Sequence, residues 1–490
     1  MTPIILVPQS LYTNIQDPAL LFIEGVLLAC FEDFKNLNAE PTFENYKREL
    51  ESSNLYSVFN KYPVAKKLLN KYEQKKTNLV SFITEEFTQN IESLHQKGIL
   101  CKKFSAIENI EIGVGDFHKG LSTAILHFEN SEKAVFKPTK ADITQSFFKL
   151  LDWANQYSSL GDYHYQVLGN NNYHWLEFVK HTPCQTEEQL HVYYERAGFM
   201  LGVLYILNAV DFHYENIIAR KGTPVIIDHE TIIQPKIHPK NQQFFKKNRV
   251  DEIEDSVLLT MLLPNQKSTS LPVGTCGYGY HKQTRAQNLT NESADRYTDN
   301  WRFITRFVDE SFQKQNIPTL NGRAVYPVEY MDELLRGFET CYQLFLDHRC
   351  FLLEDEGSPL QDFNSKSVRY IWRDTNIYTK INNQMKLPKN LISTQHYEQK
   401  IHDYLFAAFK NVPADSDLLL IHKHETAQMI KGDIPFFEVN SSSTDLQTNF
   451  GVIKDFFEYS AVDNLGRKLK KLSFQDLEFQ KKLIKESLLN

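Results

Sequence analysis

The sequence lacks the features that define several specialised classes of protein. Its longest apolar runs, 19–31 and 198–210, are shorter than the ~20 apolar residues that a bilayer-spanning helix needs, so no membrane span is expected. The first ten residues contain no basic region and only a short apolar run, which argues against a signal peptide. None of the six cysteines forms a Cys-x-x-Cys pair or a cysteine–histidine zinc spacing. We therefore predict a cytoplasmic protein with inert or buried free thiols.

A large excess of charge of one sign is also absent. Lys and Arg number 54 against 61 Asp and Glu, and the formal net charge is −7. Nucleic-acid-binding domains tend to be basic, so no nucleic-acid partner is expected. Hydrophobic residues at 42% and charged residues at 23% exclude a disordered, collagen-like or coiled-coil chain. Aromatic residues are abundant, with 34 Phe and 24 Tyr, and 490 residues suffice for several domains of ~100–200 residues with a large core.

Helical periodicity dominates the N-terminal region. Apolar residues recur at three- and four-residue spacing in 19–34, 43–60 and 79–96. We expect residues 1–105 to form a helical accessory region.

From residue 106 the pattern changes to alternation. Residues 122–128 and 133–137 alternate on either side of a Glu-Asn-Ser-Glu turn, which predicts a β-hairpin. A helix over 139–157 and a strand over 173–179 are expected to follow. We predict that residues 106–180 form a small lobe that covers a nucleotide.

The remaining chain is predicted to form a large lobe over 181–450 and a helical cap over 451–490. A long apolar helix over 187–209 is followed by two short strands within 217–227. A helix is also expected over 327–353. The basic amphipathic segment 467–489 is either a terminal helix that packs on the core through its leucines or a helix that contacts a partner or a membrane surface.

The most informative pattern lies between residues 211 and 228. Asp211 is followed five residues later by Asn216, and Asp228 comes at the end of the short hairpin. This is the spacing of a kinase catalytic loop, in which an Asp orients the substrate hydroxyl and can accept its proton, while an Asn and a second acid bind magnesium. Lys137, on an alternating strand about seventy residues earlier, would hold the triphosphate. The set predicts ATP and Mg²⁺ binding in an α+β fold with a kinase-like, two-lobed core.

The pattern departs from that of a conventional protein kinase. No Gly-x-Gly-x-x-Gly precedes Lys137, and the second acid lies in Asp-His-Glu rather than Asp-Phe-Gly. The expected helix over 139–157 has no obvious glutamate to pair with Lys137. The alternative interpretation is a set of ordinary surface polar residues on an α+β domain.

A second group of residues is not needed by a kinase. A Gly-Asp-Phe-His segment containing Asp116 and His118 precedes the first hairpin, and Arg369 and Arg373 lie far downstream. Each has an ordinary interpretation: a turn with a hydrogen-bonded histidine, and an exposed basic face of a helix with arginines four residues apart. Together they offer another chemistry, because arginine grips phosphate and histidine or aspartate moves protons. Such groups could expel phosphate from a phosphorylated side chain.

With these motifs the chain resembles the dehydratase domain of class II lanthipeptide synthetases. The matching segments run in family order over about residues 110–450: GDFHKG at 115–120, AVFKPTK at 134–140, YYERAGFMLGVLYILNAVDFHYENIIA at 193–219, PVIIDHET at 224–231, SVLLTMLLP at 256–264, SVRYIWRDTNIY at 367–378 and GDIPFF at 432–437. The resemblance implies a lipid-kinase-like core that phosphorylates Ser and Thr of a precursor peptide. It also implies a second step that eliminates phosphate to leave dehydroalanine or dehydrobutyrine.

The resemblance implies roles for individual residues. Those matching the ATP-site lysine, the catalytic loop and the metal-site acids are Lys137, Asp211, His213, Asn216, Asp228 and Glu230. Those matching residues tied to elimination are Asp116, His118, Arg369 and Thr375. The family usually has Arg-Pro-Thr where this sequence has Arg373-Asp374-Thr375, and an acid in that position would weaken phosphate binding.

Full synthetases of this kind continue into a zinc-dependent cyclase domain, whereas this sequence ends at Asn490 without a cysteine–histidine zinc set. We therefore expect a stand-alone dehydratase of a precursor peptide or protein that does not close thioether rings itself, with a separate cyclase as a potential partner. Two alternatives are a kinase that only phosphorylates and a catalytically silent module that binds a peptide or partner enzyme. The complete set of Lys137, Asp211, Asn216 and Asp228 argues against the silent module.

Overall fold

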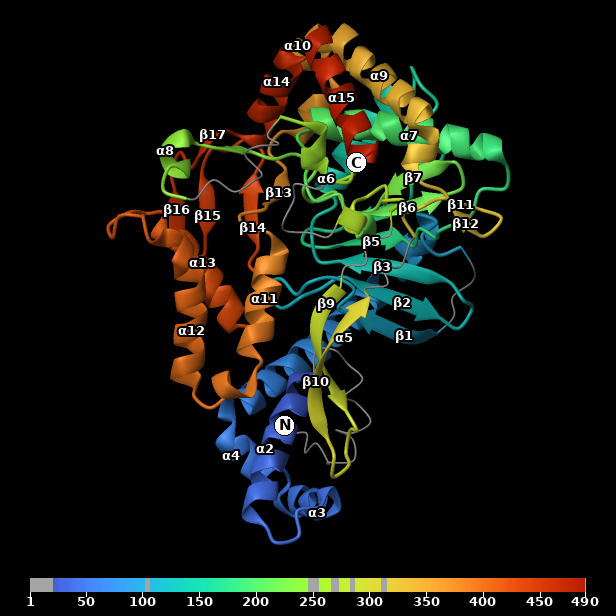
Figure 1. The fold of residues 1–490 in the computed structure, drawn as a ribbon. Coiled ribbons are helices and arrows are strands. Elements are labelled where there is room, and N and C mark those ends of the chain that lie inside the picture. The colour runs from blue at the N-terminus through green and yellow to red at the C-terminus, as the bar shows by residue number, and fades with distance from the viewer. Residues whose placement is uncertain are drawn as a thin grey trace.

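Helices alternate with small antiparallel sheets in the computed structural model, which gives a mixed α/β architecture (Figure 1). The structure describes residues 21–101, 106–245, 255–265, 273–282, 287–309 and 315–489. The N-terminal residues from which no signal peptide is expected lie outside these ranges. Within them, no helix combines the length and apolarity needed to cross a membrane.

A five-stranded antiparallel sheet forms from the alternating segments of the predicted small lobe. Its strands, in the spatial order β1-β2-β3-β5-β4, are β1 (Ile107–Ile112), β2 (Ala124–Phe128), β3 (Lys133–Lys137), β4 (Val167–Gly169) and β5 (His174–Glu177). The predicted β2–β3 hairpin and the strand within 173–179 are confirmed, whereas β1 and β4 were not predicted.

One face of this sheet is covered by the long helix α5 (Pro63–Gln96), whose Leu79, Ile83 and Phe87 are buried against it. Ala134 and Phe136 of β3 point into this interface, and the alternate positions face the other way. The period-2 geometry of a strand therefore places Lys137 on the face that α5 does not cover.

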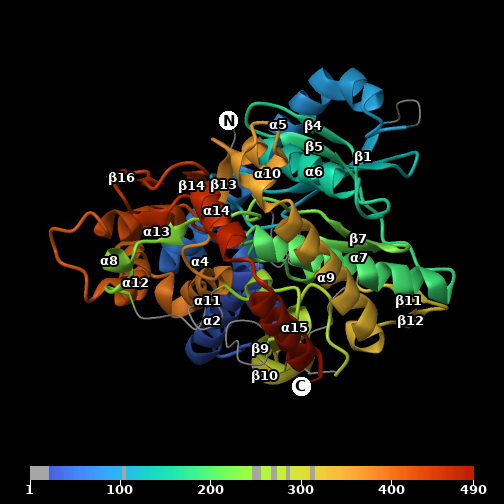
Figure 2. The same cartoon turned by 90° about the horizontal axis from the view of Figure 1, so that it is seen from above.

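Helices of the second half of the chain pack around α7 (Glu187–Ile206), whose predicted span is confirmed apart from its last turn. Figure 2 shows α9 (Met331–Asp347) crossing α7, and α15 (Phe474–Leu489) packs against α9. The neighbouring helices are α6 (Asp142–Ala154), α10 (Arg349–Glu354) and α14 (Ala461–Lys471). The hairpin of β6 (Ile217–Arg220) and β7 (Thr223–Ile226) follows α7, as predicted.

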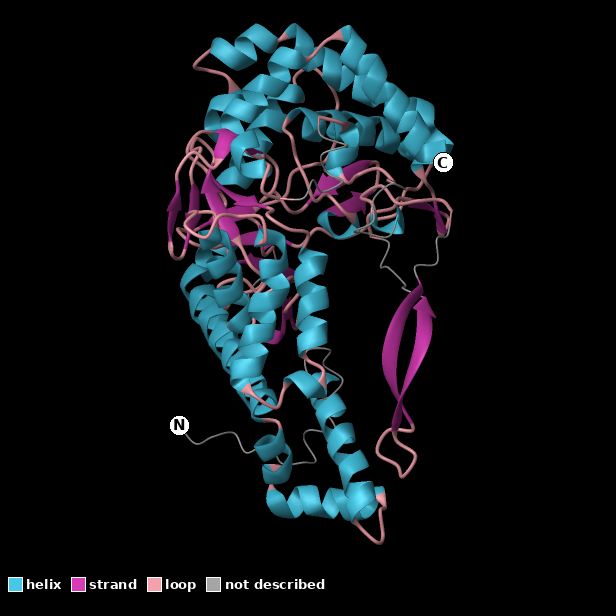
Figure 3. Ribbon diagram, turned by 60° about the vertical axis from the view of Figure 1, so that its left-hand side comes forward, coloured by secondary structure: helices cyan, strands magenta, loops and turns pink. Residues whose placement is uncertain are grey.

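A second helical layer joins distant parts of the sequence. The helices α2 (Leu21–Leu37), α3 (Phe43–Ser53) and α4 (Tyr56–Lys61) share a hydrophobic core with α11 (Thr375–Met385), α12 (Thr394–Phe406) and α13 (Leu419–Ile430). Figure 3 shows α11, α12 and α13 along one side of the molecule. The hairpin of β9 (Gln287–Ala294) and β10 (Arg302–Asp309) packs against α2 through Phe303, and Trp301 between its strands joins the same core.

Short strand pairs complete the fold. They are β13 (Ser367–Tyr370) with β14 (Phe437–Asn440), β15 (Leu446–Thr448) with β16 (Gly451–Ile453), β17 (Phe457–Tyr459) with β8 (Lys236–Ile237), and β11 (Thr319–Leu320) with β12 (Arg323–Ala324). A single helical turn, α8 (Pro239–Gln242), follows β8. The predicted helical cap over 451–490 thus begins with two strands.

Three helices predicted as continuous are interrupted. The helix expected over 43–60 breaks where Asn54 and Leu55 adopt left-handed backbone angles, with φ of 47° and 61°. The helix expected over 327–353 divides at His348 into α9 and α10. The basic segment 467–489 divides between α14 and α15. Leu469, Leu472 and Ile484 are buried and Leu483 is half-buried, which agrees with the interpretation as a helix packed on the core.

Candidate functional site

The loop that carries Asp211 is held in an unusual backbone conformation directly after α7. Asp211 has φ of 70°, a region that non-glycine residues seldom adopt and that often marks functional sites. The backbone is fixed on both sides: Thr231 Oγ1 donates to the Val210 carbonyl (2.6 Å), and the Phe212 N–H donates to the Thr260 carbonyl (3.0 Å). The carboxyl group of Asp211 is therefore fixed relative to the Asp-His-Glu-Thr segment.

Asn216 and Asp228 lie side by side because of the β6–β7 hairpin. The Ile227 N–H donates to the Asn216 carbonyl (3.0 Å), and Asn216 Nδ2 donates to the Asp211 carbonyl (2.7 Å). Lys137 reaches across from β3: its Nζ lies 3.2 Å from Asp228 Oδ2 and donates to the Ile227 carbonyl (2.9 Å). Lys137 thus pairs with an acid of the hairpin rather than with one in α6.

His213, in the middle of the same loop, is oriented by its own backbone. Its Nδ1 accepts the Glu215 N–H (3.4 Å), so a neutral ring carries its proton on Nε2, which lies 3.9 Å from Asp211 Oδ1. The imidazole therefore adds a donor beside the Asp211 carboxyl group.

The three carboxyl groups of the site have different acidities. Burial raises the pKa of Asp211, and the nearby Asp228 raises it further. Burial and the charge of Asp228 likewise raise the pKa of Glu230. Burial also acts on Asp228, but Lys137 and the Glu230 N–H outweigh it and hold its pKa below the ordinary value. Asp228 is therefore suited to bind a cation, and Asp211 to accept a proton.

The donor set fits a magnesium ion. Asn216 Nδ2 donates to the Asp211 carbonyl, which leaves Oδ1 for another partner, and the Asn216 backbone is bonded to Ile227, the residue before Asp228. Magnesium is usually held by one or two protein oxygens together with substrate phosphates and water. In the part of the chain that the structure describes, no cluster of three or more His, Cys, Asp or Glu side chains is placed to hold a metal.

His118 lies in a tight turn that also fixes its ring. Its N–H and carbonyl are bonded to Leu121, as in the ordinary interpretation of this segment. Its Nδ1 lies 2.8 Å from the Ile434 carbonyl and must donate to it, which leaves Nε2 as an acceptor in the neutral ring. Burial, together with the Arg369 charge, lowers the pKa of His118 to about 3. The imidazole is therefore neutral at pH 7, with a lone pair available to take a proton.

The GDFH turn is anchored by the distant GDIPFF segment. The Ile434 N–H donates to the Phe117 carbonyl (2.9 Å), and the Gly120 N–H donates to Asp433 Oδ1 (3.2 Å). The buried Asp433 also pairs with Lys75 of α5 (2.7 Å). Three parts of the chain thus position His118.

Arg369 lies on a strand, so the ordinary interpretation of an exposed helical face is wrong. It is paired with Glu438 in the β13–β14 ladder, and its side chain is only 11% exposed. Its N–H donates to the Glu230 carbonyl (2.8 Å), and Nη1 donates to Glu230 Oε1 (2.6 Å). The guanidinium also lies 5.3 Å from the centre of the Phe436 ring.

Arg373 and Thr375 differ from Arg369 in what they contact. Arg373 makes a two-pronged ion pair with the fully buried Glu425 (2.6 and 2.9 Å), so it stabilises the interior and is not part of a basic surface. Thr375 begins α11, and Asp374 caps that helix by accepting the Asn376 N–H (2.9 Å). The acid that replaces the usual proline thus has a local structural role.

Both predicted groups of residues meet in one site. The charge of Arg369 lowers the pKa of both Asp116 and Asp211 against the burial that raises them. Asp116, although exposed, also interacts electrostatically with His213 and Glu215 of the loop that carries Asp211. The predicted residues brought together are Asp116, His118, Lys137, Asp211, His213, Asn216, Asp228, Glu230 and Arg369. The charge of Asp374, at the start of α11, also acts on Asp211 and raises its pKa.

Sequence reasoning missed the residues whose hydrogen bonds fix the backbone of the site. Thr231 and Asp433 lie within segments that carried the resemblance, and their polar side chains in largely apolar motifs were an available signal. Gln234 and Asn464 had no such signal, because nothing in their spacing connects them to the motifs. Two hollows of about 340 and 210 Å³ beside α7, both lined by Val192 and Arg196, do not include the predicted site residues.

Comparison with known proteins places the chain in a family. A family profile described as a domain of unknown function, DUF4135, matches residues 62–440. The chain belongs to the DUF4135 family. A lacticin 481/lactococcin biosynthesis protein, LcnDR2 of Lactococcus lactis subsp. lactis, is 26% identical over 476 residues. That match covers 92% of this chain and 48% of the relative, so the chain spans about half the length of the curated protein it matches.

Proposed function

We propose that this DUF4135 protein is a kinase-like dehydratase of a precursor peptide. In the proposed reaction, ATP phosphorylates a Ser or Thr side chain, and phosphate is then eliminated to leave a dehydroamino acid. The observation that carries the proposal is the meeting of the Lys137–Asp211–Asn216–Asp228 group with Asp116, His118 and Arg369 in one site. A peptide substrate is supported by the similarity to a protein of lacticin 481/lactococcin biosynthesis.

The proposed architecture is that of a two-lobed kinase. Residues 106–180, with the five-stranded sheet, would cover the nucleotide, and residues 181–450 would carry the catalytic loop. The position of Lys137 on the open face of the sheet, within reach of Asp228, supports this arrangement. We further propose a cytoplasmic location, with a separate cyclase as a partner.

In the first step, the substrate hydroxyl would approach Asp211. Its oxygen forms a bond to the γ-phosphorus, the bond to the β,γ-bridging oxygen breaks, and ADP leaves. The hydroxyl proton passes to Asp211, whose raised pKa favours accepting it. Lys137 would hold the phosphates, and Asn216 and Asp228 would hold Mg²⁺, which neutralises charge on the phosphates when bound.

In the second step, a base takes the α-proton of the phosphorylated residue, the Cβ–O bond breaks, and phosphate departs. Arg369 would bind the phosphoester through its guanidinium, which must exchange Glu230 for the phosphate. His118 would take the proton on Nε2, because Nδ1 is committed to Ile434. A dianionic phosphoester bound nearby would raise the low pKa of His118 and so strengthen it as a base.

One observation favours the alternative of a kinase that only phosphorylates. Asp374 adds a negative charge close enough to Asp211 to raise its pKa, in a segment where the resemblance leads one to expect phosphate binding. This charge would oppose a phosphoester, although the carboxylate is partly engaged as the cap of α11. The products of the reaction distinguish the two functions.

The test uses the purified chain with ATP, Mg²⁺ and synthetic Ser/Thr-containing peptides, read by mass spectrometry. A dehydratase yields peptides lighter by one water for each modified residue. Arg369→Ala should then stop at peptides heavier by one phosphate group, whereas Arg302→Ala, an exposed arginine on β10, should behave as wild type. Accumulation of phosphopeptide by the wild type would instead establish the kinase-only function.

A further inference from the structure

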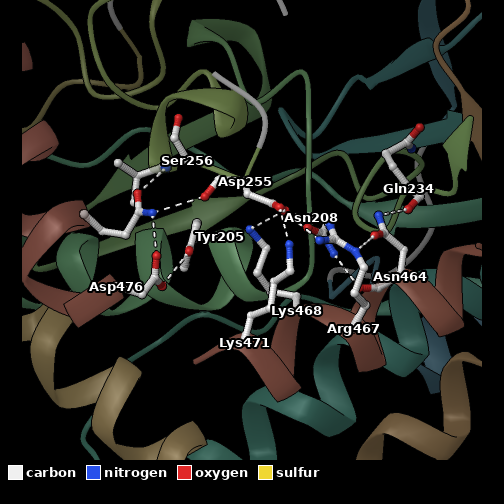
Figure 4. A network of polar contacts seen from close by, with 12 residues as sticks. Tyr205, Asn208, Gln234, Asp255, Ser256, Asn464, Arg467, Lys468, Lys471 and Asp476 are labelled. Atoms are coloured by element: carbon white, nitrogen blue, oxygen red, sulfur yellow. Dashed lines mark hydrogen bonds and ion pairs between the residues drawn. The ribbon is translucent and has the colours of Figure 1, made fainter. Parts of the chain in front are cut away.

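A chain of buried amide side chains is bonded to the backbone of Arg369. Figure 4 shows two of its members, Gln234 and Asn464. Gln234 Nε2 donates to the Arg369 carbonyl (2.7 Å), and Asn464 Nδ2 donates to the Gln234 carbonyl (2.9 Å). Gln234 and Asn464 are only 8% and 6% exposed. Buried amides are retained when hydrogen-bonded, because an unpaired carbonyl in the interior costs free energy.

The same network reaches the loop of Asp211. Asn208, three residues before Asp211 and itself in the left-handed region with φ of 58°, donates from Nδ2 to the Asn464 carbonyl (3.2 Å). Asn464 is thereby bonded to two segments that carry different parts of the site. Its side chain is bonded to the Arg369 side of the site, and its backbone to the Asp211 side.

Helix α14, which carries Asn464, is held in place by a partly buried cluster of charges around Asp255. Arg467 Nε donates to Asn464 Oδ1 (2.9 Å), and its other nitrogens make a two-pronged ion pair with Asp255 (2.9 and 2.7 Å). Lys468 and Lys471 also contact Asp255, at 3.3 and 3.1 Å. The three cations outweigh burial and hold the pKa of Asp255 well below its usual range. Asn464 therefore has a fixed position from which to hold its partners.

The position of the Arg369 backbone depends on these hydrogen bonds. Its N–H is bonded to the Glu230 carbonyl and its own carbonyl to Gln234, so a single segment of five residues fixes both polar groups of its backbone. A phosphate-binding guanidinium must be placed to within a fraction of an ångström, and such accuracy requires rigid support.

We propose that Gln234 and Asn464 are positioning residues for Arg369, which make α14 a part of the phosphate-handling site. The inference rests on the proposed function, because that function gives Arg369 a phosphate to bind. Gln234 fixes the strand that carries Arg369, and Asn464 fixes Gln234 relative to the Asp211 loop.

The test measures the binding of inorganic phosphate by calorimetry in the presence of saturating Mg-ADP, which occupies the proposed nucleotide site. Gln234→Met keeps the length of the side chain and removes its donor. Asn464→Asp keeps the oxygen that accepts from Arg467 and removes the donor to Gln234. Each should weaken phosphate binding by ~5–10-fold, the effect of losing one buried hydrogen bond that orients the arginine. The thermal stabilisation by Mg-ADP should match that of the wild type.

The control is Asn390→Leu, which removes a comparable buried amide bond, from Asn390 Nδ2 to the Gln384 carbonyl (2.8 Å), in the other helical layer. It should leave phosphate binding unchanged. Amide hydrogen exchange adds a readout that needs no ligand: β13 should exchange faster in Gln234→Met and Asn464→Asp, and not in Asn390→Leu.

The outcomes separate this inference from the proposed function. Wild-type phosphate binding that does not change in Arg369→Ala would remove the proposed role of Arg369, and this inference with it. Binding that depends on Arg369 but is unchanged in Gln234→Met and Asn464→Asp, with β13 exchanging at the wild-type rate, would overturn the inference alone.

Discussion

At the scale of single residues, chemically identical groups in this site have different tasks because their surroundings differ. Lys137 lies against Asp228 and favours its charged form. Among the described residues no cation lies as close to Asp211, and burial raises the pKa of Asp211. The electrostatic contrast suits the Asp228 carboxylate to binding a cation and the Asp211 carboxylate to accepting a proton.

Asp211→Asn should therefore abolish phosphoryl transfer while leaving nucleotide binding intact. The substitution keeps the shape of the side chain and removes the carboxylate, and the loss of a general base typically costs ~10²–10⁴-fold in rate. Transfer of labelled phosphate from ATP to a Ser/Thr peptide measures the first effect. Thermal stabilisation by Mg-ATP measures the second and should shrink only in a parallel Asp228→Ala variant. Retained transfer in Asp211→Asn would move the catalytic role elsewhere, for instance to His213.

Three buried histidines should make the protein sensitive to acid. Burial lowers the pKa of His118 and His229 to about 3, and that of His174 to about 4. An unfolded chain takes up these protons near pH 6.5, so the stability from the neutral rings is complete above that pH and is lost as the pH falls toward the folded values. His174→Gln should reduce the drop in melting temperature between pH 7.5 and 5.5. A drop as large as in wild type would contradict the assignment, and His396→Gln, an exposed histidine on α12, controls for the loss of an imidazole.

At the scale of elements, two glycines allow α7 and α9 to approach closely. A Cβ at Gly198 would overlap the Leu334 carbonyl of α9, and a Cβ at Gly337 would overlap the Glu195 carbonyl of α7. The two helices therefore cross with backbone against backbone. One of them, α7, leads directly into the loop that carries Asp211.

Gly198→Ala should destabilise the protein by ~1–3 kcal/mol, because the added methyl group forces the helices apart and outweighs the gain in helix propensity. The melting temperature from calorimetry measures the change. Gly466→Ala in α14 is the matched control, since its Cβ would meet only a Leu353 methyl group at 3.8 Å. It should be neutral or stabilising by up to ~1 kcal/mol. Equal behaviour of the two variants would show that α7 and α9 tolerate separation.

Elements specified by local pattern were predictable, and those specified by distant partners were not. The β2–β3 hairpin follows from alternation around a turn, and α7 from its apolar run. Arg369 was misplaced on a helix because its strand is defined by pairing with β14, about seventy residues later. The motifs identified most of the candidate site. Asn464 could not be predicted, because its bond to Gln234 joins residues that are far apart in the sequence and belong to no common motif.

At the scale of the whole molecule, the N-terminal helices share their cores with distant parts of the chain. One end of α5 packs with α11–α13, and the other end lies under the five-stranded sheet. Between them, Lys75 bonds to Asp433 (2.7 Å), which holds the turn of His118 through Gly120. The helix thus connects the sheet that carries Lys137 with the segment that orients His118.

Lys75→Met should slow phosphate elimination more than phosphorylation. The substitution keeps the aliphatic stem and removes the cation from the buried Asp433. The carboxylate then keeps the Gly120 N–H but loses its charged partner, and the GDFH turn loosens. His118 then aims its Nε2 less accurately, whereas Asp211, Asn216 and Asp228 keep all their bonds. The ratio of phosphopeptide to dehydrated peptide at early times, read by mass spectrometry, should rise several-fold above wild type.

Lys67→Met, on the same helix but in an exposed pair with Glu398 (3.2 Å), should leave that ratio unchanged. A rise of equal size in both variants would mean that α5 affects the site only through general stability, and an unchanged ratio in Lys75→Met would show that the turn of His118 holds without the helix.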